Sequence, residues 1–104
     1  MNITRNVHNN QVFLHLSGRL DTTTAPEFQQ TLLSEIEGGK DVVLDFCELA
    51  YVSSAGLRAL LTGQKAVLAK NQLMRLRNVS DEIMDVFHMT GFSDILTIEA
   101  QDAT

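Results

Sequence analysis

Hydrophobic residues alternate with polar ones at the start of the chain. The alternation covers residues 3–7 and again residues 12–16, and the intervening His8-Asn9-Asn10 has the composition of a turn. The chain is therefore predicted to open with a β-hairpin.

The next segments follow the spacing of helices and of buried strands. Thr24-Ala25-Pro26-Glu27 predicts a helix start in which the Thr24 side chain accepts from the Glu27 N–H, and Gly38-Gly39 ends that helix. The apolar run 41–46 is typical of a central strand that is covered on both faces. A second helix is predicted after residues 53–56, with one apolar face formed by Leu57, Leu60, Leu61, Gln64 and Leu68.

The last third of the chain continues this order. Residues 72–77 predict a strand, Ser80 caps a helix that ends at Gly91, and residues 95–98 predict a final strand. Strands that alternate with helices favour right-handed crossovers and a parallel sheet. We therefore expect an α/β fold with a mixed, mostly parallel sheet of four to five strands and helices packed against it. Residues 1–104 are expected to form a single domain with a core from about residue 2 to 100.

The composition is that of one ordinary globular domain. The 104 residues are 44% hydrophobic and carry a net charge of −5, which argues against general binding of nucleic acid. The N-terminus lacks the features of a signal peptide, and no apolar stretch approaches the ~18 residues of a membrane span. We expect a cytoplasmic protein that does not insert into a membrane. The single cysteine, Cys47, excludes an internal disulfide and is expected, like Met74, Met84 and Met89, to be buried.

Basic and acidic residues are unevenly distributed along the chain. Residues 49–80 hold five basic side chains and no acidic one, whereas the rest of the chain holds 3 basic and 13 acidic side chains. This segregation is consistent with an ordinary solvated surface, or with a cationic face that docks an acidic partner. The five basic residues are Arg58, Lys65, Lys70, Arg75 and Arg77.

Two adjacent serines, Ser53 and Ser54, lie where a strand ends and a helix begins, at an edge where open α/β sheets place their sites. A serine hydroxyl there is exposed beside unpaired backbone N–H groups, and the helix dipole favours the charge of an added phosphate. The small residues Ala55 and Gly56 leave the approach open to a foreign active site. The alternative is that the serine is only an N-cap, which stabilises a helix by about 1 kcal/mol.

The sequence contains no recognisable catalytic arrangement. The histidines His8, His15 and His88 fall on a turn, a strand and a helix end, with no spacing that directs one of them at Ser54. It also lacks a nucleophile-elbow motif, a glycine-rich phosphate loop, paired carboxylates and a metal-ligand cluster. We expect no catalytic residue, no metal and no cofactor. A small enzyme or nucleotide hydrolase at the same sheet edge is the alternative from another functional class.

Four segments of the chain resemble one known family. They are Gly18-Arg19-Leu20-Asp21, Val42-Val43-Leu44-Asp45-Phe46, Tyr51-Val52-Ser53-Ser54-Ala55-Gly56-Leu57-Arg58 and Met89-Thr90-Gly91-Phe92. In this order they resemble the STAS domain of bacterial anti-sigma factor antagonists, and the likeness extends from about residue 2 to residue 100. The segment around Ser54 is its most diagnostic part.

The resemblance implies a phosphorylation site at Ser54. In the family, a serine of an Asp-Ser-Ser/Thr-Gly-Leu signature is phosphorylated by a protein that is both a serine kinase and an anti-sigma factor. Alignment on Gly56 and Leu57 transfers this role to Ser54, with Ser53 as the rival acceptor. The chain departs from the signature at Ser53, where the family often has Asp, and at Ala55, where it often has Ser or Thr. The sequence at residues 53–57, Ser-Ser-Ala-Gly-Leu, nevertheless resembles a variant of the signature within the family.

The resemblance also implies a partner-binding surface around that serine. Asp21 matches an acidic residue near the family's phosphorylation site, and its alternative role is that of a turn carboxylate that bonds its own backbone. Arg58 steadies a phosphate or meets an acidic partner, and its alternative is a solvated helix charge. The implied surface comprises Asp21, Ser53, Ala55, Gly56 and Arg58.

The function that the resemblance implies is that of an anti-sigma factor antagonist. The unphosphorylated domain would bind the kinase that is also the anti-sigma factor, and so release a sigma factor. Phosphorylation would end that binding, and a serine phosphatase would restore it. The alternative within the same fold is a constitutive interaction subunit, for example of a transporter or lipid-trafficking complex, in which Ser54 is only a cap. Neither interpretation fixes the oligomeric state.

Overall fold

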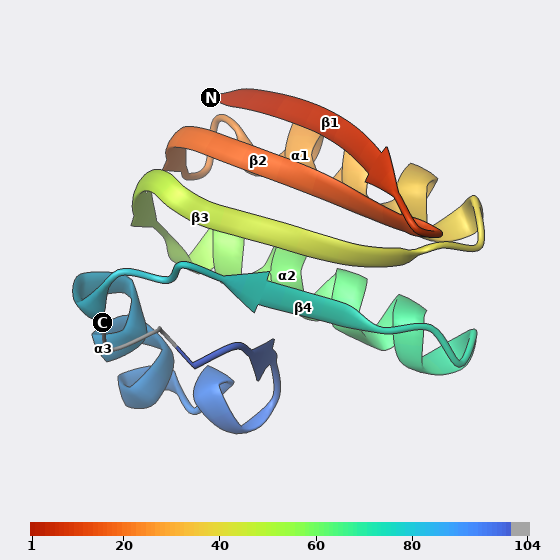
Figure 1. Cartoon of the computed structure of the whole chain (residues 1–104). Coiled ribbons are helices and arrows are strands. Elements are labelled where there is room, and N and C mark those ends of the chain that lie inside the picture. Colours follow the sequence, from red (N-terminus) through yellow and green to blue (C-terminus); the bar gives the residue numbers. More distant parts are fainter. Residues whose placement is uncertain (101–104) are drawn as a thin grey trace.

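Five strands form one sheet in the order β1-β2-β3-β4-β5 (Figure 1) in the computed structural model, which describes residues 1–100. Strand β1 pairs with β2 antiparallel, and the other neighbouring strands pair in parallel. The predicted α/β fold with a mixed, mostly parallel sheet is therefore confirmed. The strands are β1 (Asn2–His8), β2 (Gln11–Leu20), β3 (Asp41–Val52), β4 (Met74–Arg77) and β5 (Thr97–Ile98). The helices are α1 (Ala25–Glu37), α2 (Ser54–Ala69), α3 (Asp81–Thr90) and a short 3-10 helix, η1 (Phe92–Asp94).

Helices α1 and α2 cover the same face of the sheet (Figure 1), so the expectation that residues 41–46 are covered on both faces holds on the second face only for Val43. The reason is topological. The strands follow one another across the sheet in one direction, and successive right-handed crossovers in one direction place their helices on one side. Val43 points to the other face but is only 1% exposed, which explains why its run resembles a strand buried on both sides. The core lies between sheet and helices and includes Val12, Leu14, Leu16, Phe28, Leu32, Val42, Leu44, Phe46, Leu60 and Leu76.

The turn between β2 and α1 is closed by Thr24, which does not form the predicted capping box. Its side chain makes no bond to the start of α1. Instead Thr24 Oγ1 accepts from the Asp21 N–H at 2.9 Å and donates to the Arg19 carbonyl at 2.8 Å. The hydroxyl is thus used by the turn before the helix. At the other end, Gly39 adopts a φ of +87°, the left-handed exit that the sequence predicts.

Several apolar side chains predicted in the core lie at the surface. Leu68 is 66% exposed and Met89 is 86% exposed, and Cys47 is exposed as well. On α2 the buried stripe is turned toward the small residues Gly56, Ala59 and Gly63, so that Val67 is buried in place of Leu68. Small residues on this stripe allow α2 to pack closely, since an added Cβ at Gly63 would meet the Leu32 side chain. The final strand is also shorter than predicted and covers only Thr97–Ile98.

Candidate functional site

Ser53 joins the end of β3 to the start of α2 and is fixed by three hydrogen bonds. Its N–H donates to the Leu20 carbonyl at 2.9 Å, and its own carbonyl accepts from the Leu57 N–H at 2.9 Å. Its hydroxyl oxygen accepts from the Gly56 N–H at 3.4 Å, which is the N-cap bond of α2. Ser53 is half-buried. Of the two adjacent serines, Ser53 is therefore the one that forms the predicted N-cap.

Ser54 is the first residue of α2 and is exposed. Within residues 1–100, no group bonds its hydroxyl or the backbone N–H groups of Ser54 and Ala55. The first turn of the helix carries no acidic residue. Free N–H groups and the positive end of the helix dipole together favour an anion at this position. The structure thus presents at Ser54 an accessible hydroxyl in surroundings that accept negative charge.

Gly56 lies beneath this surface, where it allows α2 to begin close to the strand ends. A Cβ added at Gly56 would lie 2.8 Å from Leu20 Cγ, 2.9 Å from the Leu20 carbonyl oxygen and 3.1 Å from Val52 Cγ1. The residue is buried. Gly56 therefore supports the start of α2 from below, and its predicted place in the partner-binding surface stays a prediction. Its neighbour Ala55 is half-buried and reaches the surface.

Asp21 organises the turn that follows β2. Its Oδ1 accepts from the Thr23 N–H at 3.0 Å and from the Thr24 N–H at 3.2 Å, and Arg19 Nε lies 3.7 Å from its Oδ2. Desolvation raises the pKa of Asp21, but the hydrogen bonds from Thr24 and Thr23 outweigh it and hold the pKa below its ordinary value. The Arg19 guanidinium also lies over the Tyr51 ring, 4.2 Å from its centroid. Asp21 is thus the turn carboxylate of the alternative interpretation.

A groove of about 680 Å³ separates the starts of α1 and α2. Arg58 is the one charged residue among those that line it, and within residues 1–100 its side chain forms no ion pair. Arg58 lies four positions after Ser54, so both side chains project from one side of the helix. The groove is lined by Thr22, Ala25, Pro26, Gln29, Gln30, Leu33, Ala55 and Arg58. Of the predicted site residues, Ala55 and Arg58 line the groove, whereas Ser54 and Asp21 are the chain neighbours of the lining residues Ala55 and Thr22.

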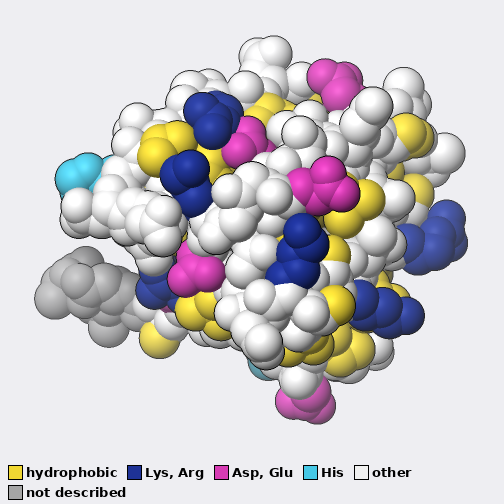
Figure 2. All heavy atoms as spheres, turned by 90° about the vertical axis from the view of Figure 1, so that its right-hand side faces the viewer, with side chains coloured by type: hydrophobic (Ala, Val, Ile, Leu, Met, Phe, Trp, Pro, Cys, Tyr) yellow, Lys and Arg dark blue, Asp and Glu magenta, His cyan; other side chains and the backbone are white. Residues whose placement is uncertain are grey.

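The basic residues of the segment 49–80 do not share one face, so the expected single cationic docking face is wrong. Arg75 and Arg77 alternate with buried residues of β4 and point away from the helices, where both approach Glu99, at 3.2 Å and 4.0 Å. Lys70 follows the end of α2, at the end of the domain opposite Ser54. Figure 2 shows that end, on which basic side chains are interspersed with acidic and hydrophobic ones. Among the described residues that line the groove, Arg58 alone carries a positive charge.

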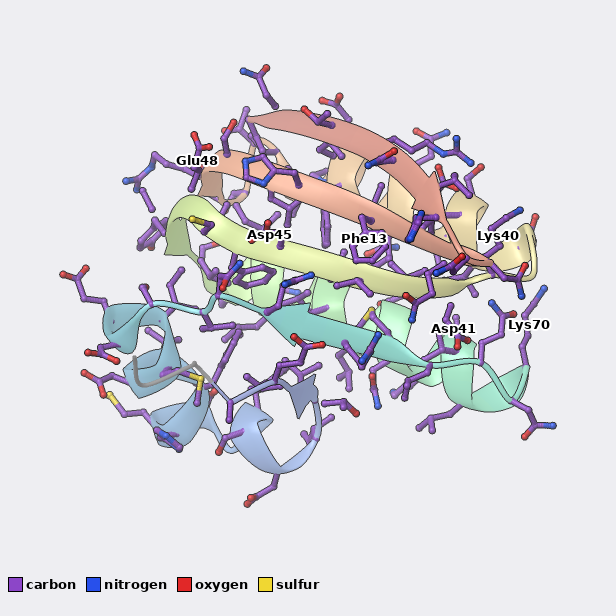
Figure 3. All side chains as sticks on the ribbon, in the orientation of Figure 1. Phe13, Lys40, Asp41, Asp45, Glu48 and Lys70 are labelled. Carbon is purple, nitrogen blue, oxygen red and sulfur yellow. The ribbon has the colours of Figure 1, made fainter. Side chains whose placement is uncertain are left out.

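A second polar cluster lies on the face of the sheet opposite α1 and α2 (Figure 3). His15 Nδ1 lies 3.3 Å from Asp45 Oδ2, and His15 Nε2 lies 3.1 Å from Glu48 Oε1. Hydrogen bonds to Asp45 and to Glu48 raise the pKa of His15 above its ordinary value. The sequence alone does not reveal this cluster, because it depends on the β2–β3 register, which places His15 opposite Asp45. The cluster is not part of the groove.

Two further kinds of feature would be evident from the geometry of residues 1–100, a metal site and a membrane span. Within residues 1–100 no group of three or more His, Cys, Asp or Glu side chains is placed to hold a metal ion. In the same part of the chain, no helix is both long and apolar enough to cross a membrane.

The chain matches one family model and is similar to proteins of known function. Residues 3–97 match a family model described as "Mlab, STAS domain". The anti-sigma-B factor antagonist of Bacillus subtilis is 28% identical over 103 residues, which cover 97% of this chain and 94% of that protein.

Two solved structures illustrate the similarity of fold. An anti-sigma factor antagonist from Mycobacterium paratuberculosis superposes with a TM-score of 0.85 at 19% identity, covering 96% of this chain and 86% of that one. The Bacillus cell fate determinant SpoIIAA in its phosphorylated form superposes with a TM-score of 0.73 at 19% identity, covering 96% of this chain and 93% of that one. At these identities the likeness establishes the fold.

Proposed function

Because the chain belongs to the STAS domain family, we propose that it is an anti-sigma factor antagonist controlled by phosphorylation of Ser54. In the unphosphorylated state it binds an anti-sigma factor that is also a serine kinase, and so releases a sigma factor. The observation that carries the proposal is the exposed, unbonded Ser54 hydroxyl at the start of α2, next in the chain to Ala55, which lines the groove between α1 and α2. A relative of nearly equal length is named an anti-sigma-B factor antagonist, which supports it.

The two serines differ in a way that favours Ser54 as the acceptor. Ser53 is half-buried, and its hydroxyl oxygen already accepts the N-cap bond from the Gly56 N–H. A kinase that modified Ser53 would have to displace that bond. Ser54 projects into solvent, and its phosphorylation leaves the cap intact.

The start of α2 suits a phosphate group without a change of fold. The free N–H groups of Ser54 and Ala55 and the helix dipole stabilise negative charge, and Arg58 stands one turn further along the same side. We propose that Arg58 pairs with an acidic group of the partner when Ser54 is unmodified. After phosphorylation the phosphate competes for that guanidinium.

The groove explains why a phosphate would end binding. Its lining is apolar or neutral except for Arg58. A phosphate on Ser54 adds a charge of about −1.5 to −2 next to the lining residue Ala55, and burying charge without full compensation at an interface costs several kcal/mol. A loss of about 4 kcal/mol weakens affinity roughly a thousandfold, which is sufficient for a switch. A serine phosphatase would restore the binding state.

The test is to incubate the purified domain with ATP and the serine-kinase anti-sigma factors of the same organism, and to locate phosphate by mass spectrometry. Ser54→Ala and Ser53→Ala are run beside the wild type. The proposal predicts phosphate on Ser54 in the wild type and in Ser53→Ala, and none in Ser54→Ala. Transfer to Ser53, or no transfer with any such kinase, contradicts the proposal. The second result favours a constitutive interaction subunit in which the serines only form the helix start.

A further inference from the structure

Strand β1 forms one outer edge of the sheet (Figure 1). Its seven residues pair with β2 on one side in an uninterrupted antiparallel register, and within residues 1–100 no strand pairs with its other side. The opposite outer strand, β5, has only two residues. A long free edge presents unpaired N–H and C=O groups that can pair with another strand.

The register identifies which backbone groups of β1 are free. A two-residue turn, Asn9-Asn10, joins the strands, so His8 and Gln11 exchange both of their hydrogen bonds. Because bonded and non-bonded pairs alternate along an antiparallel ladder, the even-numbered residues of β1 bond to β2. The N–H and C=O groups of the odd-numbered residues therefore point outward. These residues are Ile3, Arg5 and Val7.

Of the usual features that prevent strand pairing, this edge carries only one charged residue, Arg5. Strand β1 contains no proline, no lysine and no bulge. Its one cation, Arg5, is paired, since Arg5 Nε lies 2.6 Å from Glu35 Oε2 of α1. Val7 is 41% exposed on this edge.

We propose that β1 pairs antiparallel with β1 of a second copy of this chain, about a twofold axis at Arg5. Only the odd-numbered residues can form the new bonds, and this register alone pairs all three of them. Ile3 then lies opposite Val7 of the second copy, and Arg5 lies opposite its own counterpart. The two edges exchange about six backbone hydrogen bonds.

The side chains on both faces of the joined strands are complementary in this register. On the helix side, Ile3 and Val7 form apolar cross-strand pairs at both ends, each worth a few tenths to about 1 kcal/mol. At the axis, the two Arg5 side chains come close together, and each keeps its ion pair with Glu35 of its own chain. The two glutamates therefore offset the repulsion between the two arginines. On the other face the even-numbered residues are polar and carry no fixed charge.

The interface is small, and this determines how strong the dimer is. A single edge of seven residues buries less than the roughly 1,200–2,000 Å² of a stable complex, so we expect a reversible dimer that forms with rising concentration. No residue that lines the groove beside Ser54 belongs to β1. The dimer therefore presents two free grooves to a partner, and it stands or falls independently of the proposed phosphorylation.

Sedimentation equilibrium over low micromolar to millimolar concentration tests the association. Val7→Lys places a charge on the edge, and Leu68→Lys makes the same kind of change at an exposed apolar residue of α2 as the matched control. The average mass is expected to rise toward that of a dimer for the wild type and Leu68→Lys, and to stay near that of a monomer for Val7→Lys. A monomeric wild type throughout, or equal association of Val7→Lys, overturns the proposal.

Disulfide trapping tests the register. Ile3→Cys and Val7→Cys are each made in a Cys47→Ser background, and circular dichroism confirms that both fold. Bonded antiparallel pairs have Cα atoms about 5.5 Å apart, within disulfide range. A mixture of the two variants is expected to give a disulfide-linked dimer, and each variant alone is not. Dimers from a single variant, with none specific to the mixture, overturn the register.

Discussion

Replacement of Gly56 by alanine tests how the start of α2 is held against the strand ends. The new Cβ would lie 2.8 Å from Leu20 Cγ and 2.9 Å from the Leu20 carbonyl oxygen, well inside the roughly 3.5–4.0 Å of a favourable contact. The carbonyl cannot move freely, because it accepts the Ser53 N–H at 2.9 Å. The start of the helix must therefore shift away from β2, and the hydrogen bond that fixes Ser53 is strained.

The magnitude follows from two opposing effects. Overpacking of a well-packed site costs about 1–3 kcal/mol, whereas alanine gains up to about 1 kcal/mol over glycine in a helix. We expect a net loss of about 1–2 kcal/mol in the free energy of unfolding, which lowers Tm by about 5–15 °C in a domain of this size.

Differential scanning calorimetry measures this change, with Ser54→Ala as the control. Ser54 adjoins Gly56 in the same helical turn but is exposed, and within residues 1–100 its side chain makes no bond. The control is expected to unfold within about 0.5 kcal/mol of the wild type. A Gly56→Ala variant that unfolds at or above the wild-type temperature would refute the close-contact reasoning.

Three further predictions concern the N-cap of α2, the turn after β2 and the histidine cluster. Ser53→Ala removes the N-cap acceptor of α2 and is expected to destabilise the domain by about 0.5–1 kcal/mol in urea unfolding, clearly more than Ser54→Ala; equal effects would contradict this. Asp21→Ala is expected to lower Tm at pH 6 and to have less effect near pH 3, because the lowered pKa of Asp21 means that its contribution is lost as pH falls through the folded value; a loss independent of pH would exclude it. The pKa of His15 is raised, so its protonated form stabilises the fold below about pH 6.5, and this contribution disappears as pH rises through the folded pKa. The stability advantage of the wild type over His15→Gln is therefore expected to be larger at pH 5.5 than at pH 8.5, and an advantage that does not change with pH would contradict the ion-pair assignment.

Elements that depend on local signals were predictable from the sequence. The alternation of apolar residues and the two asparagines identify the opening hairpin, and Ser80 caps α3 as predicted, accepting from the Ile83 N–H at 3.3 Å. The order of strands and helices then specifies the fold class. The resemblance around Ser54 identifies the same helix start that the structure presents.

Features that depend on distant contacts were not predictable. Helical spacing alone is compatible with burial of either Leu68 or Val67. Val67 is the buried one, because α2 packs closely at Gly63 on the same side of the helix. The pairing of His15 with Asp45 requires the register of two strands that are thirty residues apart. The predicted capping role of Thr24 failed because the preceding turn offers its hydroxyl two better partners.

The central claim is that a phosphate on Ser54 ends the binding of an anti-sigma factor, and affinity measures this directly. The unmodified domain and the domain phosphorylated at Ser54 are each titrated into the same purified anti-sigma factor by isothermal calorimetry. The account predicts that phosphorylation raises Kd by roughly a thousandfold, or about 4 kcal/mol, while the circular dichroism spectrum of the domain stays unchanged. Equal affinity of the two forms would contradict it.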